Sequence, residues 1–121
     1  VNVIHTGDIH FHKLFPFIDL DNGGTVSGYI AAMQRIADMA DNDTAIIPGH
    51  GALTDRAGLL ADIDMLVDAR KRVRALADSG LSVDEVVAES PLAIYHDVYD
   101  WSFITTERMT RTLYRDLKEN R

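Results

Sequence analysis

Two short motifs place metal-binding side chains beside glycine. The first is His5-Thr6-Gly7-Asp8 and the second is Pro48-Gly49-His50-Gly51. Each follows an apolar, β-branched run typical of a strand, and glycine lets the backbone turn tightly and carry its neighbour to the end of the sheet. Carboxylate and imidazole are usual ligands of zinc, iron and manganese. Asp8 and His50 are therefore the candidate metal ligands, although each motif alone is also typical of a plain turn.

His10 and His12 are the less favoured candidates for the same site. On one extended segment Asp8, His10 and His12 would share a face, and His50 nearby would complete a site of three histidines and one carboxylate. The Gly-Asp turn is expected to break this alternation. The sequence therefore favours His10 and His12 as loop residues near the site.

The other conspicuous side chains are expected to be structural. His5 fits a hydrogen-bonded histidine at a strand end, and His96 lies in an aromatic, acidic stretch. The aromatic residues between 99 and 103 could line a substrate mouth, but such clusters more often pack a helix onto its domain, which is the favoured interpretation. The basic cluster at residues 70–74 predicts a solvated helix face.

The elements that must position these side chains are short strands and amphipathic helices. Strands are predicted at residues 1–5 and 44–47, and 9–17 could be a short strand or an irregular loop. Capping residues and apolar spacing predict helices at about 24–40, 55–79, 83–90 and 105–119, with 97–103 irregular. Three of these helices have more apolar surface than so small a sheet can cover. More sheet is therefore expected, from missing sequence or from a partner chain.

Taken in order, the motifs resemble the second half of the metallo-β-lactamase superfamily, nearest to its glyoxalase II-like and related hydrolase branches. The resemblance rests on His5-Thr6-Gly7-Asp8, Phe15-Pro16-Phe17-Ile18-Asp19, Gly23-Gly24 and Ile47-Pro48-Gly49-His50-Gly51, and it covers essentially the whole chain. It implies one α/β domain over residues 1–121. That domain would be half of an αββα sandwich, with a few short strands covered by about four helices.

The resemblance also implies roles for the two candidate ligands. Asp8 would be the carboxylate that bridges two metals, and His50 a ligand of one of them. In this family the metals activate water and polarise the reacting oxygen of esters, thioesters, lactams or phosphodiesters. The family's first-half run, His-x-His-x-Asp-His, is absent, and so is the ligand histidine that precedes its Gly-Asp strand. Because zinc sites normally use three or four protein ligands, Asp8 and His50 alone would hold a metal weakly, and no catalytic residue is assigned.

Composition excludes several classes of function. The 121 residues include no cysteine, so one domain is expected, with no disulfide framework and no zinc–thiolate site, as fits a cytoplasmic protein. The formal net charge of -7 opposes binding to nucleic acid, which depends on neutralising phosphates. The apolar runs are too short to span a bilayer, and no signal peptide is visible.

Three functions are compatible with these observations. The favoured one is a truncated half-domain that is not catalytic alone and forms a homodimer through unsatisfied helix faces and a sheet edge. The alternative is a metal-dependent hydrolase of esters, thioesters or lactams, completed by a missing N-terminal half or a partner chain. The start at Val1, directly in a strand, agrees with that alternative. The third is a small-ligand binding module that uses the former catalytic cleft.

Overall fold

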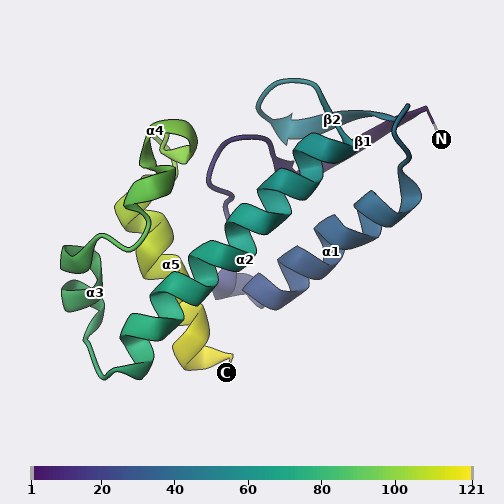
Figure 1. The fold of residues 1–121 in the computed structure, drawn as a ribbon. Helices are drawn as coiled ribbons and strands as arrows, with labels where there is room; N and C mark the ends of the chain where they lie inside the picture. Colours follow the sequence, from purple (N-terminus) through teal and green to yellow (C-terminus); the bar gives the residue numbers. More distant parts are fainter. Residues whose placement is uncertain (1, 121) are drawn as a thin grey trace.

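The sheet begins with the longest strand of the chain. In the computed structural model, which describes residues 2–120, β1 (Val3–Phe11) pairs in parallel with β2 (Ala45–His50). The short β3 (Thr54–Asp55) pairs antiparallel with β2, giving the order β1-β2-β3. Parallel neighbours need a long crossover, and α1 (Val26–Met39) supplies it (Figure 1). The predicted α/β class is confirmed.

The helices begin and end where local capping residues predict. After α1 come α2 (Arg56–Asp78), α3 (Val83–Glu89), the short α4 (His96–Tyr99) and α5 (Thr106–Glu119). Single 3-10 turns occur at 20–22 and 93–95. The four predicted helices are confirmed to within two residues at each end. In residues 2–120, no helix combines the length and apolar character needed to cross a membrane.

Two stretches differ from the prediction. The turn expected to end the first strand is instead an irregularity inside it: Gly7 has φ +56°, the register with β2 shifts there, and β1 continues to Phe11. Continued pairing with β2 makes this possible, because residues 48–50 also stay in the sheet rather than forming a loop. Part of the stretch expected to be irregular forms α4. Val1, which the predicted strand includes, lies outside the described residues.

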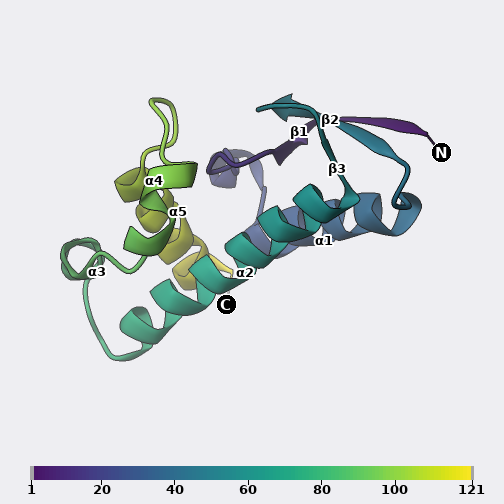
Figure 2. The ribbon, with the colours of Figure 1, turned by 45° about the horizontal axis from the view of Figure 1, so that its top comes forward.

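Within residues 2–120, helices cover one face of the sheet and leave the other uncovered (Figure 2). α1 contacts β1, and α2 contacts β2 and β3; Figure 2 shows both helices on the same side of the sheet. Ile46 points to this side and is fully buried, whereas Val3 and Ile47, on the opposite face, are 56% and 37% exposed. The described part of the chain therefore leaves a partly apolar sheet face without a second layer.

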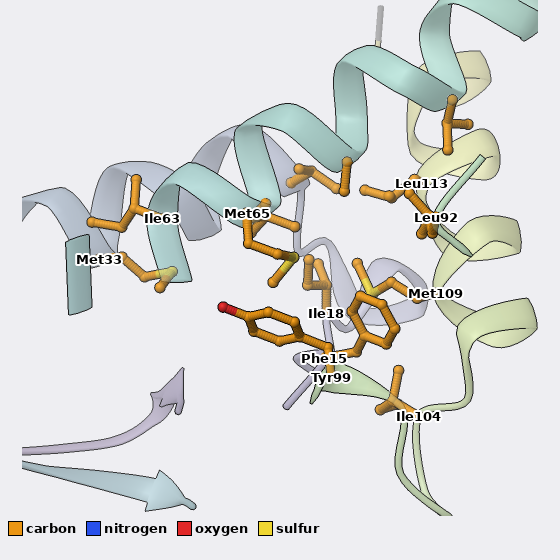
Figure 3. Packing of buried hydrophobic residues seen from close by; sticks show 14 of the residues in the cluster. Phe15, Ile18, Met33, Ile63, Met65, Leu92, Tyr99, Ile104, Met109 and Leu113 are labelled. Carbon is orange, nitrogen blue, oxygen red and sulfur yellow. The ribbon is translucent and has the colours of Figure 1, made fainter. Parts of the chain in front are cut away.

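The main core lies between helices rather than beneath the sheet. α2 packs against both α1 and α5. Figure 3 shows Phe15, Tyr99 and Met109 packed together in the space between α2 and α5. The apolar stripe of α5 faces this core, because Met109, Leu113 and Leu117 are all buried. Burial of each such side chain contributes about 1.5–3 kcal/mol, so this cluster anchors the segments that reach the sheet end.

Candidate metal sites at the end of the sheet

Asp8 and His50 come together at the surface. Their strands are parallel neighbours, so residues far apart in the sequence reach the same end of the sheet. Asp8 Oδ1 lies 3.4 Å from His50 Nε2, and the two side chains are 73% and 46% exposed. The structure therefore brings the two predicted ligands into one solvent-facing pair.

Aromatic rings fix the position of the His50 imidazole. The ring stacks on Phe11 at 4.7 Å between centroids, with an interplanar angle of 10°, and lies 5.6 Å from Trp101. The indole N–H of Trp101 donates a 2.8 Å hydrogen bond to the Phe15 carbonyl, which anchors the ring. Packing thus presents one ring of the pair in a defined orientation, although it is close to solvent.

Gly49 permits the close approach of the two strands. A Cβ at this position would lie 2.5 Å from the Gly7 carbonyl oxygen and 2.6 Å from Asp8 Oδ1. Contacts this short force atoms to move, and one of the displaced atoms would be the candidate ligand itself. The glycine predicted to shape this strand end therefore makes room for the Asp8 carboxylate.

The Asp8–His50 pair fits part of a metal site. Two ligands bonded at 2.1 Å to a tetrahedral metal lie about 3.4 Å apart, which matches the separation of these two atoms. Within residues 2–120, however, no cluster of three or more histidine or acidic ligands includes either residue. His5 does not contribute, because its Nδ1 accepts a hydrogen bond from the Gly7 amide at 3.2 Å. The pair could supply at most two ligands, fewer than a zinc site normally uses.

A second cluster lies beneath the sheet, at the junction of β1 and α2. Asp62 Oδ2 is 2.6 Å from His10 Nε2 and 2.7 Å from His12 Nδ1. His10 and Asp62 are buried and the His12 side chain is 10% exposed. These three residues could hold a metal ion, since their ligand atoms all lie within 4.8 Å of one another.

This arrangement corrects the sequence-based expectation for His10. The sequence predicts that both histidines are loop residues near Asp8, and only His12 lies outside the strand. The strand instead continues through His10, and the irregularity at Gly7 shifts its register, so that Asp8 faces solvent while His10 is buried. His12 follows the end of β1 and its amide donates to the His50 carbonyl at 3.0 Å. The structure does not place the two histidines in one site with Asp8 and His50.

Asp62 accepts hydrogen bonds on both carboxylate oxygens. Its Oδ1 accepts from the Tyr99 hydroxyl at 2.9 Å and from the Lys13 amide at 3.3 Å. Burial raises the pKa of Asp62, but hydrogen bonds from His10, His12 and Tyr99 outweigh it, and the net pKa is below the usual value. Burial beside this carboxylate raises the pKa of Tyr99. Asp62 is therefore an ionised, buried anion at neutral pH.

Sequence reasoning missed Asp62, although the helix pattern contains a signal. Asp62 lies three residues after Leu59 and four before Leu66, which places it on the apolar face of α2. A carboxylate on a buried face needs partners, because an isolated buried charge is strongly unfavourable. That argument identifies Asp62 as unusual, but only the fold reveals that its partners are two histidines.

The remaining candidates have structural contacts. His96 Nδ1 is 2.6 Å from the Thr106 hydroxyl at the start of α5. Tyr99 is buried in the core, in agreement with the packing role expected for it. Phe103 is 52% exposed and contacts the Arg108 guanidinium of α5 at 4.9 Å from its ring centroid, whereas Trp101 also contacts His50.

Comparisons with known proteins identify no family for this chain. None of the protein-family models matches it, and no curated protein matches it. The metallo-β-lactamase resemblance rests on the motifs alone.

Proposed function

We propose that this chain is a metallo-β-lactamase-like half-domain that supplies Asp8 and His50 to the metal centre of a hydrolase and is not catalytic alone. The observation that carries the proposal is the convergence of Asp8 Oδ1 and His50 Nε2 to 3.4 Å at the exposed end of two parallel strands. These are the two residues that the motif order assigns to the metal.

The number of ligands explains why the half-domain is inactive by itself. A catalytic zinc site normally has three protein ligands and an open position, and this pair provides two. The other ligands come from outside the described residues, on another segment or another chain. When bound, zinc, iron or manganese supplies Lewis-acid activation of water and of an ester, thioester or lactam carbonyl. The part of this chain in that chemistry is to hold Asp8 and the stacked His50 ring in place.

The uncovered face of the sheet supports the need for a complementary part. Val3 and Ile47 are exposed on this face, and Leu53, in the loop after β2, is 67% exposed. Burying such side chains against a second layer stabilises an assembly by about 25 cal/mol per Å² of apolar surface. A second sheet on this face would cover these side chains and bring new residues to the Asp8–His50 end.

Manganese titration followed by amide NMR tests the proposal. Mn²⁺ broadens resonances near the site where it binds. We expect selective, saturable broadening around Asp8 and His50 in a His12→Gln background, which removes a ligand of the buried cluster from the measurement. Asp8→Asn and His50→Gln should each abolish the broadening.

A matched control uses another exposed histidine–carboxylate pair of the chain. His96 Nδ1 lies 3.9 Å from Asp100 Oδ1, without the strand-end geometry. Equal broadening at this pair, or none at Asp8 and His50, would overturn the metal assignment. Turnover of chromogenic ester, thioester or lactam substrates by the isolated chain with added Zn²⁺, Fe²⁺ or Mn²⁺ would overturn the claim that it is inactive alone.

The same exposed face favours a second candidate, a homodimer without catalytic function. Here the uncovered sheet faces of two copies pack together. Size-exclusion chromatography with light scattering should then give twice the chain mass, and Ile47→Lys should give a monomer. A stable monomer of the unaltered chain would contradict self-association.

A further inference from the structure

We propose that His10, His12 and Asp62 form a second metal site, buried between β1 and α2, which binds one divalent transition metal independently of Asp8 and His50. This inference does not rest on the proposed function. It concerns three residues of the described chain and needs no partner.

The chemistry of the three side chains suits such an ion. Two imidazoles and one carboxylate are a common ligand set for iron, zinc and related divalent metals. His10 Nε2 and His12 Nδ1 both point at Asp62 Oδ2, so three ligand atoms meet at one place. The single negative charge of Asp62 offsets part of the charge of a divalent ion, which would otherwise be unfavourable in a buried position.

The separations require only a small expansion. Ligands bonded at 2.1 Å lie about 3.0 Å apart in an octahedral site and about 3.4 Å in a tetrahedral one. The present nitrogen–oxygen distances are 2.6 and 2.7 Å, so they must lengthen by about 0.3–0.4 Å for an octahedral site or by about 0.7–0.8 Å for a tetrahedral one. His12 lies beyond the end of β1, and Gly58 leaves its ring room, because a Cβ there would be 3.0 Å from His12 Cε1. The partly exposed His12 ring is therefore the ligand that can adjust.

The surroundings already hold the carboxylate in place. Tyr99 and the Lys13 amide both donate to Asp62 Oδ1, which leaves Oδ2 for the metal. Outer-sphere hydrogen bonds of this kind orient metal ligands and increase affinity. The His10 ring is fully buried, and its Nε2 contacts Asp62 Oδ2. Its Nδ1 has no hydrogen-bond partner among the described residues. One nitrogen of this imidazole is thus directed at the proposed metal position.

A metal here would connect distant parts of the chain. Asp62 is 52 residues from His10 and 50 from His12. Binding only to the folded state stabilises that state by mass action. We therefore infer a structural role, in which the ion fixes β1 against α2.

Cobalt titration of the full chain tests the site. Co²⁺ bound to imidazole and carboxylate gives visible absorption bands, and metal analysis after dialysis gives the stoichiometry. We expect one Co²⁺ per chain to remain after dialysis at slightly alkaline pH, because the two ligands of the exposed pair hold a metal weakly, together with a raised thermal midpoint. The Asp8→Ala/His50→Ala double variant should retain both effects.

Four variants separate this site from a purely structural hydrogen-bond cluster. His12→Gln and Asp62→Asn should abolish the bands, and Tyr99→Phe should weaken affinity by about 10- to 100-fold as an outer-sphere change. Asp64→Asn, at an exposed carboxylate of the same helix, should leave binding unchanged. Because His12 is partly exposed, His12→Gln keeps the test valid even if Asp62→Asn fails to fold.

Two outcomes would overturn the inference. One is an unaltered chain that shows no cobalt bands. The other is binding that survives His12→Gln but disappears in the Asp8→Ala/His50→Ala double variant, which would assign all metal to the exposed pair.

Discussion

Replacing Asp62 with alanine removes the acceptor of four hydrogen-bond donors at once. Two are imidazole nitrogens of His10 and His12, and two are the Tyr99 hydroxyl and the Lys13 amide. The residue lies on the buried face of α2, so water cannot readily replace the carboxylate. The variant therefore tests whether this cluster stabilises the fold in the absence of metal.

The expected loss in free energy of unfolding is about 3–5 kcal/mol, the range for removing one partner of a buried, hydrogen-bonded charge. The individual groups give a loss of at least this size. Each buried donor left unsatisfied costs about 1–3 kcal/mol, and His12 recovers part of this because its ring reaches solvent. A domain typically has only about 5–15 kcal/mol of stability. Asp62→Ala should therefore come close to unfolding the chain.

Urea denaturation followed by circular dichroism, in buffer with a chelator, measures this effect. Asp62→Asn should lose less, about 1.5–3 kcal/mol, because its amide oxygen still accepts from Tyr99 and Lys13. Asp64→Ala serves as the control and should stay within about 0.5 kcal/mol of the unaltered chain. If Asp62→Ala is as stable as this control, the buried cluster does not stabilise the fold.

The Asp62 carboxylate also predicts a pH dependence. Its pKa in the folded chain is below the usual value because hydrogen bonds from both histidines and Tyr99 outweigh the effect of burial. A lowered folded pKa means that the unfolded state binds the proton more readily. The stabilisation is therefore complete above the unfolded pKa of about 4 and is lost as pH falls through the lower folded pKa. Urea midpoints across this acid range should fall more steeply for the unaltered chain than for Asp62→Asn, and parallel curves would contradict the assignment.

Three further substitutions test the packing around the sites. Gly49→Ala should destabilise the chain by about 1–3 kcal/mol and displace the Asp8 carboxylate, because the new Cβ overlaps that carboxylate. Thermal unfolding measures the loss of stability, and the Mn²⁺ titration measures the displacement. Unchanged Mn²⁺ binding would contradict the overlap. Trp101→Phe should lower the free energy of unfolding by about 1 kcal/mol, because the hydrogen bond to the Phe15 carbonyl disappears. It should also shift the NMR resonances of the His50 ring, and unchanged resonances would show that Trp101 does not position that ring. Ser82→Ala should lose about 1 kcal/mol by urea denaturation, because the capping box of α3 is broken, whereas Ser82→Gly should lose only a few tenths.

Much of the fold could be predicted because the signals are local. The α2 cap at Asp55, the α3 capping box at Ser82 and Glu85, and the glycine after α2 each satisfy backbone groups within a few residues. Helix boundaries followed from these residues. The strand boundaries did not, because whether Gly7 ends a strand or bends it depends on β2, about 40 residues away.

The two candidate sites also differ in whether local sequence signals identify them. Asp8 and His50 could be selected from the sequence by their type, their order and the glycine beside each, because a ligand at a strand end needs only a local turn signal. Their 3.4 Å separation came from the parallel pairing of β1 and β2. The buried cluster was decided by tertiary structure alone. His10 points inward because β1 continues through it, and the packing of α2 against the sheet brings Asp62 to its ring. The two residues are 52 apart in the sequence, so no local pattern predicts their contact.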